Sequence, residues 1–189
     1  MDADTAARRR TARRTLGLLA LVCATPVIAS YVAYYWLHRS AHVNYGELEV
    51  KPAPPIVGTA DGASWSLASL RGRWVLLVAS ERACAAACER ALYATRQART
   101  IQNREQDRIT RVLLLPSGAA PPSQALLAEH PGLVVAEADR SQWPALDGGK
   151  DAIYVVDPLG NLVLRYPADP DIRGLAKDLE RLLRASRIG

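Results

Sequence analysis

Cysteine and histidine are scarce in this chain, and their scarcity limits the chemistry that it can perform. The 189 residues include three cysteines, Cys23, Cys84 and Cys88, and three histidines, His38, His42 and His130. No Ser-His-Asp set, phosphate-binding loop or pair of catalytic carboxylates is visible in the sequence. The search for a functional site therefore begins with the two cysteines that lie four positions apart.

An excess of charge of one sign is also missing from most of the chain. The net charge of +5 comes largely from residues 1–42, which carry six Lys/Arg against two Asp/Glu. Residues 43–189 carry eighteen Lys/Arg against seventeen Asp/Glu. A domain that binds nucleic acid usually gathers positive charge on its own surface. The distribution therefore gives no support to a nucleic-acid partner.

The only apolar segment long enough to cross a bilayer lies near the amino terminus. Residues 16–37 form a run of 22 positions, and a helix needs about 20 apolar residues to cross a bilayer. Five arginines precede the run, whereas only Arg39 follows it closely. The positive-inside rule therefore predicts a basic cytoplasmic tail at residues 1–15, a transmembrane helix at 16–37, and the remainder outside the cytoplasm.

Three other interpretations of this run are weaker. A cleavable signal would end near residues 27–29, but the apolar run continues beyond them. A lipoprotein site at Cys23 would need a small residue before it, and Val22 is not small. The pair Arg13-Arg14 resembles a twin-arginine signal only weakly. We therefore expect an uncleaved anchor, in which Cys23 packs within the membrane rather than reacting.

The rest of the chain divides into a tether and a folded domain. Residues 38–55 are expected to be the tether, because the segment ends in three prolines that resist both helix and sheet. Residues 56–189 are expected to fold. Within them, residues 74–79 form a continuous apolar run, which is typical of a strand buried on both faces.

The elements expected after this first strand alternate between helix and strand. A long helix is predicted at residues 85–106, with a stripe of small apolar residues, and further helices at 124–129 and from about 169 onward. Strands are predicted at residues 112–115, 133–136, 152–156 and 162–166, the last two joined by a hairpin turn. This order predicts an α/β domain: a mixed sheet with helices on both faces, in a thioredoxin-like fold.

Cys84 and Cys88 stand at the junction between the first strand and the long helix. Positions i and i+4 of a helix lie about 6 Å apart at Cα, which permits a disulfide. The helix amino terminus and Arg82 would lower the pKa of Cys84, making it the attacking thiol and Cys88 the resolving one. Two soft thiolates could instead bind Cu(I), or the pair could be two small buried side chains.

Three motifs in the sequence resemble those of the SCO/SenC family of thioredoxin-like proteins. They are residues 62–78 before and within the first strand, residues 154–160 at the closing hairpin, and the spacing Cys84-x-x-x-Cys88. Members are membrane-anchored, face the periplasm or its equivalent, and help to build the copper centre of cytochrome c oxidase. The resemblance implies a single-pass protein of the bacterial inner membrane with a periplasmic domain. Its partner would be a cytochrome c oxidase subunit or another assembly factor.

The chain departs from the family pattern at the expected copper ligands. Ala85 and Glu89 follow the cysteines where the family usually has proline, and residues 147–151 contain no histidine where the family supplies its third copper ligand. His130 precedes the wrong strand, and the thioredoxin-type proline is missing directly before Ala152. Thiol–disulfide exchange therefore ranks first, a Cu(I) carrier second and a non-catalytic, membrane-tethered assembly factor third, with no metal site assigned.

Overall fold

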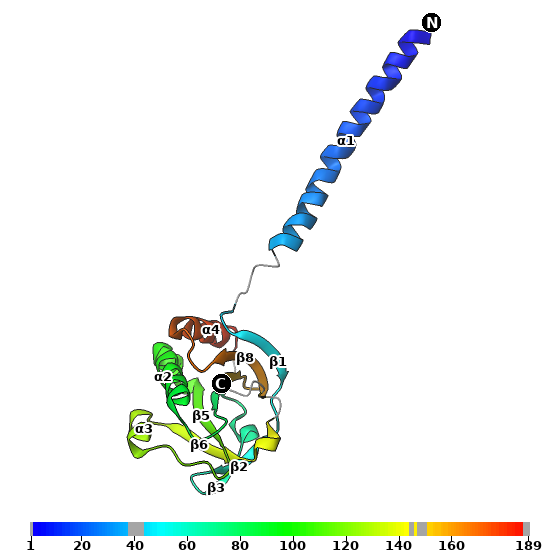
Figure 1. Cartoon of the computed structure of the whole chain (residues 1–189). Coiled ribbons are helices and arrows are strands. Elements are labelled where there is room, and N and C mark those ends of the chain that lie inside the picture. The colour runs from blue at the N-terminus through cyan, green and yellow to red at the C-terminus, as the bar shows by residue number, and fades with distance from the viewer. Residues whose placement is uncertain (1, 38–43, 144–145, 147–150, 187–189) are drawn as a thin grey trace. The chain divides into compact units, whose positions relative to one another are not determined.

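The computed structural model describes residues 2–37, 44–143, 146 and 151–186. The chain separates into two units, Met1–Val43 and Asn44–Gly189, each of which is described by itself. The first unit consists of α1 (Asp2–Leu37), a single helix of 36 residues (Figure 1). Its segment Arg13–Val32 has a mean hydropathy of 1.9 and no buried residues. The predicted apolar helix, long enough to cross a membrane, is therefore confirmed.

The second unit is built on one eight-stranded sheet with the strand order β1-β8-β7-β4-β5-β6-β2-β3. The strands are β1 (Glu47–Pro52), β2 (Val57–Ala60), β3 (Ala63–Ser66), β4 (Trp74–Ala79), β5 (Ile109–Pro116), β6 (Leu133–Ala138), β7 (Ala152–Val156) and β8 (Asn161–Pro167). Strands β4, β5 and β6 run parallel, whereas β7 pairs antiparallel with both β4 and β8. The predicted mixed α/β sheet is confirmed.

The helices of this unit are α2 (Ala86–Ile101), α3 (Gln124–Glu129) and α4 (Ile172–Ala185). Short 3-10 helices cover Leu67–Leu70, Asn103–Arg108 and Arg140–Gln142. The prediction that residues 85–106 form one long helix is wrong at its end, because Gln102 caps α2 and Asn103 has a positive φ of 51°. Left-handed backbone of this kind interrupts an α-helix.

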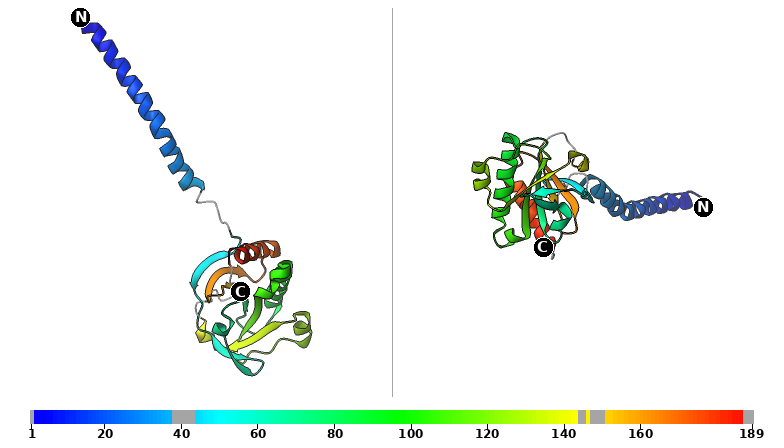
Figure 2. Two further views of the ribbon diagram at one scale, coloured as in Figure 1. Left: turned by 180° about the vertical axis from the view of Figure 1, so that it is seen from behind. Right: turned by 90° about the horizontal axis from the view of Figure 1, so that it is seen from below.

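Strand β4 separates the two halves of the core. Its alternate side chains Trp74, Leu76 and Val78 face a cluster that includes α2 and α4, which contact each other on this side of the sheet (Figures 1 and 2). The remaining side chains face a second cluster, covered by residues from the 56–67 segment and by Trp143 and Leu146. The prediction of helices on both faces is therefore wrong as far as the α-helices of the described residues are concerned. Large apolar side chains from β3, from the 3-10 helix Leu67–Leu70 and from residues 56, 143 and 146 cover the second face.

The segment that was expected to be a tether includes an edge strand. Residues 47–52 form β1, which pairs antiparallel with β8. Proline is tolerated at this place because the outer side of an edge strand needs no hydrogen bonds. The nearby prolines therefore do not prevent a strand at residues 47–52, whereas residues 53–55 have no regular structure.

The chain before β1 is fastened by a buried carboxylate, in what we call the Asp178 cluster (Tyr45, Gly46, Tyr166 and Asp178). Asp178 in α4 is 2% exposed, and its Oδ2 accepts hydrogen bonds from the amides of Tyr45 (2.8 Å) and Gly46 (2.9 Å). The hydroxyl of Tyr166 donates to the same oxygen at 3.0 Å. A Cβ on Gly46 would lie 2.5 Å from the Tyr166 ring, so only glycine fits there.

Candidate functional site

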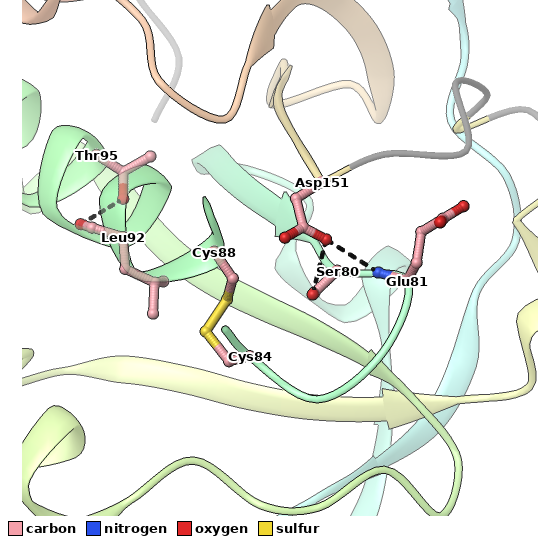
Figure 3. Close-up of a disulfide and its surroundings, with 7 residues drawn as sticks. All are labelled: Ser80, Glu81, Cys84, Cys88, Leu92, Thr95 and Asp151. Carbon is pink, nitrogen blue, oxygen red and sulfur yellow. Dashed lines mark hydrogen bonds between the residues drawn. A yellow bond between two sulfur atoms is a disulfide. The ribbon is translucent and has the colours of Figure 1, made fainter. Parts of the chain in front are cut away.

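The cysteine pair lies at the carboxyl end of the central strand β4, where the chain turns into α2. Cys84 precedes the first helical residue by two positions, and Cys88 is the third residue of α2. The pair therefore lies at the predicted strand-to-helix junction, with Cys88 within the helix and Cys84 before it. Their Cα atoms are 5.2 Å apart, and the two sulfurs are joined in a disulfide (Figure 3).

The two sulfur-bearing residues differ in their exposure. Cys88 is fully buried in the cluster beneath α2. Cys84 is half-buried and packs against the edge of the same cluster. A partner from solution therefore reaches Cys84 more easily than Cys88.

The amino terminus of α2 has no side-chain cap. Ala85 occupies the N-cap position, and its carbonyl accepts the first helical hydrogen bond from the amide of Glu89 at 2.9 Å. The free amides of the first turn carry the positive end of the helix dipole, which favours an anion nearby. On reduction, the helix therefore favours a thiolate at the cysteine pair, although Glu89 in the first turn opposes it.

A carboxylate that the sequence analysis missed holds the loop leading to Cys84. The Oδ1 of Asp151, directly before β7, accepts hydrogen bonds from the hydroxyl of Ser80 at 2.9 Å and the amide of Glu81 at 3.2 Å (Figure 3). The antiparallel register between β4 and β7, which pairs Ala79 with Ala152, brings these residues together. No local sequence pattern indicates a contact between residues 71 positions apart.

A surface hollow of about 470 Å³ lies beside this loop. Its walls include the small residues of the cysteine segment and the end of β8, together with several charged side chains: Ser80, Glu81, Arg82, Ala83, Ala85, Ala87, Asp151, Arg165, Pro167 and Ala168. Glu81 also pairs with Arg140 at 3.5 Å. Arg82, which was predicted to add positive charge near Cys84, is exposed on this wall.

His130 lies away from the cysteines, at the amino ends of β5 and β6. It is 3% exposed, and its Nδ1 accepts a hydrogen bond from Nη1 of Arg111 at 3.2 Å. Burial, followed by the positive charges of Arg111 and Arg96, lowers the pKa of His130, whereas Glu129 raises it. The neutral ring is thus a packing and hydrogen-bonding group of the core.

The other histidines that were considered as metal ligands lie outside the described residues, as does most of the segment compared with the family's histidine position. His38 and His42 lie there, as do residues 147–150, the main part of the stretch compared with the family's histidine position. Within the part of the chain that the structure describes, no group of three His, Cys, Asp or Glu side chains is placed to hold a metal ion.

A central strand followed by a cysteine pair and a helix, on a mixed sheet closed by a hairpin, defines a thioredoxin-like domain. Residues 74–186 match the family model described as transmembrane-like, thioredoxin-like, C-terminal domain. This match covers more than half of the sequence, and the chain belongs to that family. The predicted thioredoxin-like fold is confirmed.

Solved structures with the same fold include Sco proteins and thiol–disulfide oxidoreductases. Apo Sco1 from Thermus thermophilus is 19% identical, with a TM-score of 0.57 over 77% of this chain and 98% of that chain. The thioredoxin domain of a thiol-disulfide oxidoreductase from Bacteroides vulgatus is 18% identical, with a TM-score of 0.56 over 72% and 99%. Copper-bound ScoI from Bradyrhizobium japonicum is 18% identical, with a TM-score of 0.52 over 69% and 98%. No curated protein matches the sequence.

Proposed function

We propose that the protein is a membrane-anchored thiol–disulfide exchange protein that uses Cys84 and Cys88. The observation that carries the proposal is the bonded pair at the start of α2, with one cysteine buried and the other reachable. An uncapped helix terminus favours a thiolate at this place. Thiol–disulfide oxidoreductases among the structures of the same fold are consistent with such a role.

In the proposed reaction the reduced pair transfers two electrons to a disulfide of another protein. The Cys84 thiolate attacks one sulfur of that disulfide, forms a mixed disulfide, and releases the other sulfur as a thiolate, which takes a proton from water. The Cys88 thiolate then attacks the Cys84 sulfur, forms the internal disulfide and releases the second thiolate of the substrate. A dithiol reductant restores the pair by the reverse steps.

The location that we propose is the bacterial inner membrane, with the thioredoxin-like domain in the periplasm. The support comes from the arginines before the apolar run and from the length of α1. The proposed division of the chain remains a tail at 1–15, an anchor at 16–37, a tether at 38–55 that now includes β1, and a domain at 56–189. An alkaline phosphatase reporter fused after Gly189 should be active in an exporting host, and an inactive fusion would reverse the orientation.

The partner that we propose is a subunit of cytochrome c oxidase or another factor in its assembly. The support is the resemblance to the SCO/SenC family and the recurrence of Sco proteins among structures of the same fold. Exchange with a cysteine-bearing oxidase subunit would keep its metal-binding thiols reduced. Loss of the protein should then lower the amount of assembled oxidase in the membrane.

A second candidate is a Cu(I) carrier, with copper as cargo rather than cofactor. Two thiolates 5.2 Å apart at Cα can bind Cu(I) once the disulfide is reduced, and copper is present in the ScoI structure of the same fold. Among the described residues, no His, Asp or Glu side chain joins the pair in a group of three that could hold a metal ion. We therefore expect Cu(I) binding and weak Cu(II) binding, and a spectrum of Cu(II) with nitrogen and thiolate ligands would contradict this.

The first test of the exchange function is a redox titration of the full-length protein in detergent. The protein is equilibrated in glutathione or dithiothreitol buffers, and the free thiols of Cys84 and Cys88 are counted by mass spectrometry. A structural disulfide has a potential below about −300 mV, whereas an exchanging pair should lie above it. If the thiols stay apart in air, or if glutathione never reduces the bond, the exchange function is wrong.

A further inference from the structure

The hollow of about 470 Å³ adjoins the attacking cysteine through both of its neighbours in the chain. Ala83 and Ala85, the residues directly before and after Cys84, both line the hollow, and so does Ala87 in the first turn of α2. Cys84 itself is half-buried, at the end of the loop that begins after β4 (Figure 3). A protein whose disulfide reaches Cys84 therefore brings the residues beside its own cysteine to this hollow.

The apolar part of the wall consists of small side chains, which leave room for a polypeptide. Its members come from the cysteine loop, the start of α2 and the chain around the end of β8: Ala83, Ala85, Ala87, Pro167 and Ala168. Binding pockets typically measure about 300–1,000 Å³ and combine apolar walls with a few polar groups that fix the orientation of the ligand. The hollow is within this range, so its charged side chains are the groups that can select a ligand.

Three of the four charged side chains in the wall are engaged with the protein itself. Glu81 pairs with Arg140 at 3.5 Å, and Arg165 pairs with Glu47 at 3.0 Å. The carboxylate of Asp151 accepts two hydrogen bonds from the start of the cysteine loop. A ligand that enters the hollow has to compete with these contacts before it can pair with any of the three.

Arg82 is the fourth charged residue of the wall, and it differs from the others. Its side chain is exposed, and among the residues that the structure describes no ion pair or hydrogen bond joins its guanidinium to another group. It precedes Cys84 by two positions in the loop that leads to α2. A guanidinium binds a carboxylate through two parallel hydrogen bonds, with geometric specificity. The wall therefore offers one available positive charge close to the attacking cysteine.

We infer that Arg82 is a specificity-determining residue that selects disulfides with a carboxylate side chain next to the attacked cysteine. The substrate segment lies in the hollow along the small apolar side chains, and its Asp or Glu pairs with Arg82. A Lys or Arg at the same place in the substrate is repelled. This inference rests on the proposed exchange function and names the class of substrate: a protein segment in which an acidic residue adjoins a disulfide-bonded cysteine.

The test uses three cyclic peptide disulfides that differ only in the residue beside one cysteine, which is Glu, Gln or Lys. The reduced full-length protein in an uncharged detergent, with Cys23→Ala in every sample to leave two thiols, reduces each peptide. Chromatography of the reduced peptide gives the second-order rate constant. The readout is the ratio of the rate constants for the Glu and Lys peptides. The peptide's charge acts on its own thiols equally with every protein, so differences in this ratio report the protein alone.

Three variants assign the ratio to Arg82. The parent ratio should exceed that of Arg82→Gln by about threefold at low salt, and the excess should shrink at about 1 M salt, where exposed charges are screened. Arg82→Glu should lower the ratio below that of Arg82→Gln. Arg104→Gln removes the same charge beyond the far end of α2, from an exposed position, and should keep the parent ratio. Equal ratios in the parent and Arg82→Gln, or an equal fall in Arg104→Gln, would overturn the inference.

A binding measurement separates this inference from the function on which it rests. Fluorescence anisotropy with the oxidised protein reports binding of labelled peptides in which serine replaces both cysteines, so it needs no exchange. A parent that reduces none of the disulfide peptides contradicts the proposed function, and the binding ratio of the Glu and Lys peptides still tests Arg82. A parent that exchanges with a ratio unaffected by Arg82→Gln contradicts the inference alone.

Discussion

The two ends of the parallel strands differ in whether their side chains can react with a partner from solution. At the amino ends, Arg111 and His130 are buried, and Arg111 donates to His130 and to the carbonyl of Pro131, the latter at 3.0 Å. At the carboxyl end, the bond between Cys84 and Cys88 can be broken and the attacking cysteine is half-buried. A buried polar group with satisfied partners supports the fold, whereas a breakable bond beside a hollow provides a reaction site.

The largest effect should follow replacement of the attacking thiol. Cys84→Ser should lower the rate at which the reduced protein reduces glutathione disulfide by at least about 100-fold, because the nucleophile is lost. The rate is measured as release of reduced glutathione by the full-length protein in detergent. Cys23→Ser serves as the control and should keep the parent rate. Exchange that persists in Cys84→Ser would place the reaction elsewhere.

The opposite end of the strands should respond in stability alone. Arg111→Met should lower the free energy of unfolding by about 3 kcal/mol, because the buried Nδ1 of His130 and the carbonyl of Pro131 lose their donor. Urea unfolding measures this change, and the exposed Arg104→Met provides the control. The rate of thiol exchange should remain that of the parent. If the folded Arg111→Met variant lost most of its thiol–disulfide exchange, the prediction that the amino ends of the strands affect stability alone would be wrong.

Reduction of the cysteine pair should have a smaller effect on stability. The disulfide closes a very short loop, so its removal should cost about 2 kcal/mol by the chain-entropy estimate. Urea unfolding with and without dithiothreitol measures the difference, with a Cys84→Ser, Cys88→Ser double variant as the reference that cannot respond. Unfolding of the domain on reduction would instead identify the bond as a structural staple.

The smallest predicted effect is a pH dependence from His130. Burial and the charge of Arg111 lower its pKa in the folded protein, so the unfolded chain takes up the proton first. The stabilising contribution is complete above the unfolded value of about 6.5, and it declines as the pH falls toward the folded pKa. His130→Gln, which can still accept from Arg111, should lose this part of the dependence between about pH 7.5 and 5.5. An equal slope in both proteins would contradict the prediction.

Local patterns in the sequence predicted those elements whose burial or capping depends on residues that are adjacent in the chain. Strand β4 has the predicted bounds because six consecutive buried side chains produce a continuous apolar run. Helix α3 also has the predicted bounds, and Ser123 caps its start by accepting from the amide of Leu126. The cysteine pair was found in the same way, since the spacing of Cys84 and Cys88 is a local feature.

Features that depend on distant pairing were missed. Strand β1 exists because it pairs with β8, more than 100 residues later, and Arg165 of β8 pairs with Glu47 across that distance. Asp151 meets Ser80 only through the register of β7 on β4. Ile101 lies inside the predicted helix at residues 85–106, but it is 51% exposed because α2 ends there.

The Asp178 cluster has a mechanical consequence if α1 serves as the proposed membrane anchor. A pull on the chain at Asn44 first loads the bonds from Tyr45 and Gly46 to Asp178 and then the ladder between β1 and β8. Strands β8 and β7 separate β1 from β4, the strand that leads into the cysteine loop. Force transmitted along the tether is therefore carried by α4 and the sheet edge. Because α4 packs against α2, part of this load reaches the helix that carries Cys88.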